Sequence, residues 1–386
     1  MHLGRRGAGH ALGVEICPNA CYNTRMSKRT KHRKAHTDGH NSAPHTRSKA
    51  ANQGAQTELL AALDLGTNNC RLLIARPSFQ HASAHKSLKV VDSYSRIVRL
   101  GEGISDSGRL SDDAMDRTFK ALQSCQAKLD KHPDIRGRFV ATEACRRAAN
   151  AEDFLKRVRD TLGLHIDIIS NEEEARLAFL GCSSLLQPDT RFALAFDIGG
   201  GSTEFMWVKI DSTQPFSSHK RHLIQDWLSI PYGVMNMSEQ FGGPAFTEMY
   251  FEEIVARLVE QLSPMDRDNG ISERIWKDRV QMLSTSGTVT TLAAIHLDLP
   301  RYDRSKVDGL KLSVSDIRNA TQTLMRMSPS ERAAHPCIGS ARTDFILSGC
   351  AIFEAIVRTF PIEKISIADR GVREGIIVSL MREQHL

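Results

Sequence analysis

The sequence has no long apolar run. Although 41% of its 386 residues are hydrophobic, no stretch approaches the roughly 20 apolar residues that a membrane-spanning helix needs. The first residues include arginines but no apolar segment of signal-peptide length. We therefore predict neither membrane insertion nor export by a signal peptide, and we place the protein in the cytoplasm.

Cysteine is also scarce, and its spacing excludes a disulfide framework. Cys17 and Cys21 have histidines nearby, but their spacing is too irregular to predict a zinc site. We expect reduced thiols throughout the chain. The eight cysteines are at positions 17, 21, 70, 125, 145, 182, 337 and 350.

Charge is concentrated at the N-terminus. Residues 1–57 contain ten Lys and Arg against only Glu15 and Asp38, which gives this segment a net charge of +8. The whole chain has a net charge of +6, so the remaining residues together carry −2. Few large apolar residues and no sustained period predict a disordered basic tail. The tail is interpreted either as a tether to polyanions such as nucleic acid or polyphosphate, or as a solvated extension ahead of a true start at Met26.

From Glu58 onward, short apolar runs alternate with amphipathic segments in the order βββαβαβα. After Gln187 the order begins again, with a helical insertion, and the pattern closes with a helix over 372–383. The repetition predicts two α/β domains, one formed by 58–171 plus about 372–386 and the other by 172–371. The predicted strands are 58–63, 70–76, 88–100, 138–141, 164–170, 192–197, 203–210, 221–230, 280–284 and 364–368; the helices are those beginning at 111 and those over 151–162, 172–186, 247–262, 289–297, 313–327, 344–359 and 372–383.

Each half contains the same kind of turn. Asp64 ends an apolar run before the turn at 66–68, and Asp197 ends another before the turn at 199–203. Glycine-rich turns can direct several backbone N–H groups at a phosphate, and hydroxyl side chains can add donors. Two equivalent turns suggest an internal duplication. The predicted phosphate-binding residues in these turns are Gly66, Thr67, Asn68, Gly199, Gly200, Gly201, Ser202 and Thr203.

A third turn at 284–288 opens a helix, and its Ser286, Gly287 and Thr288 form a weaker anion site at a helix N-terminus. The carboxylates of Asp64 and Asp197 would repel a polyphosphate unless a hard cation lies between them. Mg2+ satisfies this requirement because it takes one or two carboxylates and keeps phosphate oxygens and waters as its other ligands.

Six segments carry recognisable patterns: ALDLGTNNCRLLIA, ATEACRRAAN, SNEEEARLAFLG, FDIGGGSTEF, STSGT and DRGVREG. Taken together, they resemble the exopolyphosphatase/guanosine pentaphosphate phosphohydrolase family. The resemblance runs from about Leu60 to the C-terminus. It implies two actin-like (ribonuclease H-like) α/β domains of the sugar kinase, Hsp70 and actin superfamily, with a cleft between them. Sugar kinases and chaperones lack NEEEAR just ahead of DIGGGSTE.

The resemblance also assigns roles. It places the catalytic base at Glu174, with the extra acid of NEEEA leaving Glu173 as a competitor, and it places the magnesium-associated acids at Asp197 and Glu204. Glu174 has a second interpretation, because Asn171 as N-cap would put it in a capping box. The family's phosphate-binding positions fall on Asn68, Arg146, Gly199 and Ser202.

We therefore expect hydrolysis of terminal phosphoryl groups from inorganic polyphosphate or guanosine pentaphosphate (pppGpp), by a water that Glu174 activates with Mg2+ present. Two alternatives stay open: an ATP-dependent phosphotransferase of the same superfold, and a non-catalytic polyphosphate- or alarmone-binding protein. Two partner hypotheses are a second copy in a homodimer and a polyanion held by the basic tail. The C-terminal His-Asp type domain of some members is missing, so the substrate preference is left open.

Overall fold

The computed structural model describes residues 58–78, 87–214, 218, 221–241, 246–340 and 342–383, all within one unit, Gln53–Leu386. The predicted basic tail, with Cys17 and Cys21, lies outside the described residues. None of the described helices combines the length and apolar character that crossing a membrane requires.

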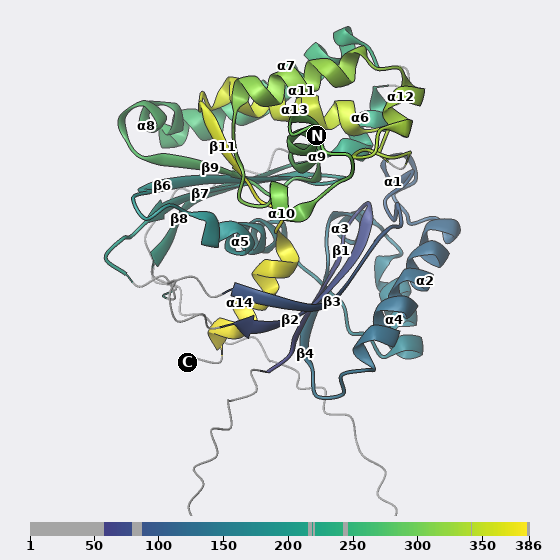
Figure 1. Cartoon of the computed structure of the whole chain (residues 1–386). Coiled ribbons are helices and arrows are strands. Elements are labelled where there is room, and N and C mark those ends of the chain that lie inside the picture. Colours follow the sequence, from purple (N-terminus) through teal and green to yellow (C-terminus); the bar gives the residue numbers. More distant parts are fainter. Residues whose placement is uncertain are drawn as a thin grey trace, which may run out of the picture. The chain divides into compact units, whose positions relative to one another are not determined.

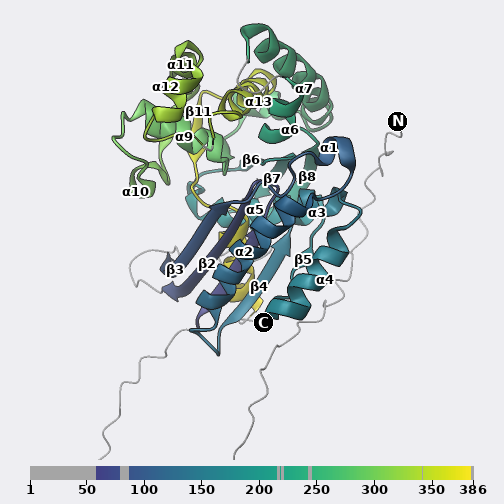
Figure 2. The same cartoon turned by 90° about the vertical axis from the view of Figure 1, so that its right-hand side faces the viewer.

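The first sheet has the strand order β3-β2-β1-β4-β5. β1 pairs antiparallel with β2 and parallel with β4. Helices α2 and α4 cover one face of this sheet, as Figure 2 shows, and their apolar side chains form one core cluster with it. The elements are β1 (Leu60–Leu65), β2 (Asn69–Ser78), β3 (Ser87–Ile97), β4 (Arg136–Ala141), β5 (Asp167–Ile168), α1 (Ile104–Ser107), α2 (Asp112–Leu129), α3 (Glu143–Arg147) and α4 (Ala151–Leu162).

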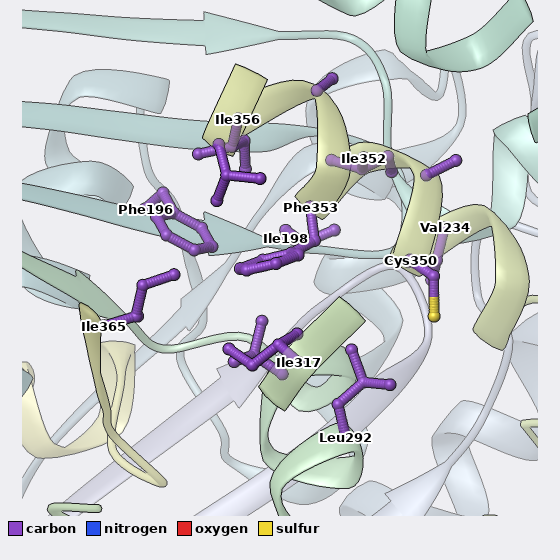
Figure 3. Close-up of a cluster of buried hydrophobic side chains, with 14 of the residues drawn as sticks. Phe196, Ile198, Val234, Leu292, Ile317, Cys350, Ile352, Phe353, Ile356 and Ile365 are labelled. Carbon is purple, nitrogen blue, oxygen red and sulfur yellow. The ribbon is translucent and has the colours of Figure 1, made fainter. Parts of the chain in front are cut away.

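The second sheet has the order β10-β11-β9-β6-β7-β8, and β6 pairs antiparallel with β7 and parallel with β9. Its largest core lies against α9, α11 and α13, where Phe196 and Ile198 meet Phe353 and Leu292 (Figure 3). The strands are β6 (Phe192–Ile198), β7 (Thr203–Ile210), β8 (His222–Ile230), β9 (Val280–Ser284), β10 (Lys311–Ser313) and β11 (Lys364–Ile367). The helices are η1 (Ser183–Leu185), α6 (Val234–Gln240), α7 (Glu248–Asn269), α8 (Ile271–Lys277), α9 (Gly287–His296), α10 (Arg304–Val307), α11 (Val314–Arg326), α12 (Pro329–Ala334) and α13 (Ile346–Thr359).

The two sheets repeat one pairing scheme, which confirms the predicted two-domain actin-like fold. The repetition extends to single residues: Asp64 on β1 stands opposite Arg71 on β2, and Asp197 on β6 stands opposite Glu204 on β7. Each aspartate is the residue before last on its strand. The two loops that follow the aspartates are therefore placed equivalently.

Helices α5 (Asn171–Cys182) and α14 (Val372–Glu383) pack against each other between the two sheets (Figure 1). Leu177 of α5 belongs to a cluster with β1 and α14, whereas Phe179 belongs to a cluster with β6 and β7. Helix α5 thus contacts both sheets. The predicted boundary between the two domains, at 171/172, stays a prediction.

The crossing of α5 and α14 depends on two glycines. A methyl group added at Gly375 would overlap the carbonyl oxygen of Leu177, and one added at Gly181 would overlap the carbonyl oxygen of Gly371. These obstacles are backbone atoms, so no change of side-chain rotamer relieves them. Gly371 itself serves this packing, because its carbonyl also accepts the N–H of Gly375 at 3.0 Å.

We predict that Gly375→Ala lowers the free energy of unfolding. Alanine is intrinsically better than glycine inside a helix by about 1 kcal/mol, but overpacking costs typically about 1–3 kcal/mol or more, and here backbone must move. Urea denaturation measures the change. Gly287→Ala is the matched control, because its added methyl group would meet no heavy atom within 4 Å. An unchanged or raised stability of Gly375→Ala would contradict this account of the crossing.

Candidate active site

A cleft of about 120 Å³ lies between the two sheets and is bordered by the loops that follow β1, β6 and β9. It also contains side chains that the sequence did not single out, namely Arg71, Glu143 and Arg342. The predicted site residues that line it are Asp64, Gly66, Thr67, Asn68, Glu174, Asp197, Gly199, Gly200, Gly201, Ser202, Gly287 and Thr288.

The first two loops close in the same way and approach each other closely. The N–H of Gly66 donates to Asn69 O at 2.9 Å, and the N–H of Gly199 donates to Ser202 O at 2.9 Å. A Cβ atom at Gly200 would lie 3.0 Å from Thr67 Cβ, which is tighter than ordinary van der Waals contact. Glycine at this position therefore allows the two loops to approach each other closely across the cleft.

Glu174 stands at the start of α5, one residue further into the helix than predicted. Ser170 is the N-cap, and its hydroxyl accepts the N–H of Glu173 at 3.2 Å. The prediction that Asn171 caps the helix and that Glu174 completes a capping box is therefore wrong. The physical reason is that Ser170 has the extended backbone of an N-cap, with φ −69 and ψ 161, whereas Asn171 is already helical and donates to Ser229 Oγ at 2.7 Å.

Glu173 points away from the cleft, unlike its neighbour. Its carboxylate accepts from Arg138 at 2.8 Å, and its side chain is 30% exposed. It is absent from the cleft lining, whereas Glu174 is part of it. The geometry therefore favours Glu174 over Glu173 as the residue that can act on a molecule in the cleft.

The side chain of Glu174 is largely buried, with 13% of it exposed, and its Oε2 accepts from Arg146 Nη2 at 2.7 Å. Burial raises the pKa of Glu174 to about 7; the Arg146 charge opposes the shift, and the nearby carboxylates Asp64 and Asp197 add to it. A group whose pKa is close to neutrality is well suited to take up a proton during a reaction at that pH.

The other acids of the cleft are similarly perturbed. Burial raises the pKa of Asp197 to about 6, against the opposing charge of Arg71 and with a contribution from Asp64. Burial also raises the pKa of Asp64, and Arg71 again opposes the shift. Each carboxylate makes the others harder to ionise, so the cleft favours the binding of a cation or of protons.

Glu204 occupies a different place. It is 2% exposed and does not line the cleft, and its Oε1 accepts from Ser202 Oγ at 2.6 Å and from Ser229 Oγ at 3.1 Å. Burial, followed by repulsion from Glu174, raises its pKa well above the ordinary value. The structure thus places Glu204 behind the cleft rather than at its surface.

Three predicted phosphate-binding residues are also outside the cleft lining. The hydroxyl of Thr203 donates to Tyr232 O at 2.7 Å and is fully buried, so its side chain is not available to a phosphate and that prediction needs correction. The hydroxyl of Ser286 caps α9 by accepting the N–H of Thr288 at 3.1 Å. Arg146 lies behind Glu174, where its guanidinium donates to Glu143, Glu174 and Ile169 O.

Oxygen ligands suited to a hard cation are present in the cleft. The Oδ1 atom of Asn68 is buried and has no hydrogen-bond partner among the described residues, and it shares the cleft with Asp64 and Asp197. Within those same residues, no three His, Cys, Asp or Glu side chains converge into a metal-binding group. A cation that needs only one or two carboxylates, such as Mg2+, fits this set of ligands.

Two arginines that the sequence analysis missed supply positive charge to the cleft. Arg342 donates to Thr291 Oγ1 at 2.9 Å, and burial together with repulsion from Arg71 lowers its pKa. Arg71 could have been found from the sequence, because it lies on the predicted strand that follows the first loop. A hairpin closed by this loop pairs Arg71 with Asp64. No local signal marks Arg342, which the fold brings to the cleft from a distant loop.

Comparisons with known proteins agree on the nature of this fold. A family model described as the Ppx/GppA phosphatase family matches residues 79–384. Exopolyphosphatase 2 of Mycobacterium tuberculosis is 29% identical over 335 residues, covering 83% of this chain and 98% of that protein. The crystal structure of the Aquifex aeolicus member of the Ppx/GppA family has a TM-score of 0.69 at 29% identity and covers 85% of this chain and 99% of its own.

A further solved structure, an exopolyphosphatase from Cytophaga hutchinsonii, supports the fold alone. It has a TM-score of 0.71 at 22% identity and covers 85% of this chain and 98% of its own.

The raised pKa of Asp197 predicts how stability depends on pH in the presence of a chelator. Its pKa of about 6 in the folded state exceeds the ordinary value of 3.8, so the folded chain binds more protons than the unfolded chain between these values. Stability therefore falls as pH rises through this window and stays lower above it. Asp197→Asn should remove this loss and stabilise the metal-free protein at about pH 8 by roughly 1–3 kcal/mol.

Urea denaturation in EDTA at about pH 4 and pH 8 measures this difference, and the two proteins should be nearly equal in stability at the lower pH. A variant that is less stable than the parent protein at the higher pH would show that the Asp197 carboxylate is favourably held.

Proposed function

The chain belongs to the Ppx/GppA phosphatase family, and we propose that it releases the terminal phosphoryl group of inorganic polyphosphate as orthophosphate. The observation that carries the proposal is the position of Glu174, a buried carboxylate with a pKa of about 7 that lines a cleft between two glycine-rich loops. A carboxylate in such a place has the geometry of a general base.

The loops and arginines supply the binding of the phosphates. The loops at 66–68 and 199–202 offer backbone N–H groups and hydroxyls, and the N-terminus of α9 adds a third anion-binding edge. Arg71 and Arg342 contribute positive charge to the same cleft. We infer that these groups hold the oxygens of the terminal phosphoryl groups, which is where most of the catalysis of phosphoryl transfer arises.

In the proposed reaction the oxygen of a water forms a bond to the terminal phosphorus while the bridging P–O bond breaks. Glu174 takes the proton of the water, and the shortened polyphosphate leaves with the electron pair of the broken bond. The proposal needs no covalent intermediate. Among the described cysteines none lines the cleft, and burial raises the pKa of Cys145 to about 12, so this thiol is a poor nucleophile.

We further propose that Asp64, Asp197 and the Oδ1 of Asn68 hold Mg2+. When bound, Mg2+ would neutralise charge on the phosphate oxygens. The support for this assignment is the unpartnered Oδ1 of Asn68 beside two carboxylates whose ionisation is unfavourable without a cation. The position of Glu204 behind the cleft gives no support to its predicted role as a ligand.

Glu174→Gln tests the proposed base. The amide keeps the size of the side chain but cannot take a proton from water, and general-base catalysis typically contributes about 10²–10⁴-fold. Phosphate release should fall by that factor, while polyphosphate binding persists because the loops are unchanged. The substrates to compare are long-chain polyphosphate, pppGpp and ATP, since the same chemistry applies to each terminal phosphoryl group.

Glu173→Gln is the matched control, because the same change is made one residue away and outside the cleft. Near-normal turnover by a well-folded Glu174→Gln protein would exclude Glu174 as the base. Conversion of ATP to ADP only in the presence of an acceptor, with the phosphoryl group recovered on that acceptor, would favour a phosphotransferase. Binding without turnover by the parent protein would favour a sensor.

Asp197→Asn tests the cation site. Removing one carboxylate should raise the Mg2+ concentration needed for half-maximal phosphate release by about tenfold or more. Glu204→Gln should have a smaller effect, because Glu204 does not line the cleft. Asp92→Asn serves as the control for a carboxylate in an ion pair, here with Lys128 at 2.8 Å on the surface. An unchanged Mg2+ titration for Asp197→Asn would remove this residue from the site.

A further inference from the structure

One buried carboxylate of the cleft has no part in the reaction described above. Glu143, on α3, is 9% exposed and lines the cleft. Its Oε2 accepts from Nε of Arg146 at 3.1 Å and from Nη2 of Arg146 at 2.9 Å. Glu143 therefore binds one edge of the same guanidinium that contacts Glu174.

The remaining donors of Arg146 are directed elsewhere. Nη1 donates to the carbonyl oxygen of Ile169 at 2.9 Å, and Nη2 donates to Glu174 Oε2 at 2.7 Å. A guanidinium is planar and its N–H groups point in fixed directions. Of its five N–H groups, two engage Glu143, one engages Ile169 O and one engages Glu174 Oε2, while the second N–H of Nη1 makes no hydrogen bond to the described residues. With Glu143 on the Nε–Nη2 edge, a single N–H of Arg146 reaches Glu174.

This arrangement leaves the two oxygens of Glu174 in different situations. Oε2 is anchored by Arg146, whereas no hydrogen bond from the described residues reaches Oε1. A base needs an oxygen free to accept from the water that it activates, so anchoring one oxygen and leaving the other open suits the proposed role.

Loss of the Glu143 charge would change this geometry. An arginine whose Nε edge is free tends to bind a carboxylate through two parallel N–H bonds, which engage both carboxylate oxygens. In the absence of Glu143, Arg146 could turn this edge toward Glu174 and occupy Oε1 as well. The base would then be blocked while the loops that bind phosphate stayed in place.

We propose that Glu143 is a positioning residue for Glu174: by holding one edge of Arg146, it limits that arginine to a single hydrogen bond with Glu174 and keeps Oε1 open to the attacking water. The proposal rests on the proposed function, because it assumes that Glu174 is the base.

A purely structural role for Glu143 makes a different prediction. A Cβ atom at Gly201 would lie 3.1 Å from Glu143 Cγ, so the Glu143 side chain packs beneath the second glycine-rich loop. If Glu143 served only to support this loop, its substitution would displace a phosphate-binding element. Substrate binding would then weaken and KM would rise.

The test begins with Glu143→Gln, which is nearly isosteric and removes the charge. With long-chain polyphosphate, we expect kcat to fall by about 10- to 100-fold, the range typical of residues that orient a reacting group, and KM to change by less than about twofold. The control is Glu102→Gln, the same change at a half-exposed carboxylate of the same lobe that pairs with Arg117 at 2.7 Å. Its turnover should equal that of the parent protein.

A double-mutant cycle with Glu174→Gln then locates the effect. If Glu143 acts through Arg146 on Glu174, Glu143→Gln costs kcat in the parent protein and nothing further once Glu174 is already Gln. An equal loss in both backgrounds, or a raised KM with kcat kept, would overturn the proposal. Near-normal turnover by Glu174→Gln alone would instead refute the proposed base, so the two failures are distinguishable.

Glu143→Asp covers the case in which Glu143→Gln is poorly folded. It keeps the charge beside Arg146, so it should retain more of kcat than the Gln variant when both are measured at a temperature where circular dichroism shows each to be folded. If the measured kcat shows no such advantage for Asp, or the Asp variant keeps kcat but raises KM, charge at this position does not govern turnover and the proposal fails.

Discussion

Asp64, Asp197 and Glu174 share a cleft of about 120 Å³, and the cost of ionising three carboxyl groups so close together governs how the rest of the site is built. Burial raises the pKa of each of them. An anionic substrate entering the same space would make ionisation costlier still. Positive charge in the cleft lowers this cost. It comes from the arginines, the N–H groups of the loops and the proposed Mg2+.

The position of α5 determines where the proposed base, Glu174, lies. This helix contacts both sheets and crosses α14 at Gly181 and Gly375, so its first turn is held where the two lobes meet. Ser170 caps the helix, and in this first turn Glu174 lines the cleft whereas Glu173 does not. The packing of α5 against both sheets therefore fixes the position of the helix that carries Glu174.

Much of this arrangement could be predicted from the sequence, because the features that determine it are local. The strand over 280–284 and the helices over 151–162 and 372–383 have the predicted bounds, since apolar periodicity marks both of their ends. The two loops were found because an acid before glycines at a strand end is a local pattern. Helices α3 and α6 were missed because five to seven residues are too few to show a period.

The contacts that complete the site join residues that are far apart in the sequence, and only the folded structure shows that they meet. Arg342 and Glu143 reach the cleft only after α13 and α3 have packed. Nothing near Arg342 in the sequence marks it as part of a site, and the segment that contains Glu143 pointed to Arg146 instead. The shift of the helix cap from Asn171 to Ser170 depends on a backbone conformation one residue earlier. An error of one residue there was enough to misplace a capping box, although the choice of Glu174 was unaffected.

The two lobes repeat one pairing scheme but differ in charge at an equivalent position. Arg71 stands opposite Asp64 in the first lobe, and Glu204 stands opposite Asp197 at the same register in the second. The first loop therefore has its own cation beside the aspartate, whereas the second has a further acid. We infer that the two loops are not interchangeable: the first has Arg71 on the paired strand, and the second depends on charge supplied from elsewhere, either by Arg71 of the first lobe, which opposes the pKa shift of Asp197, or by a bound cation.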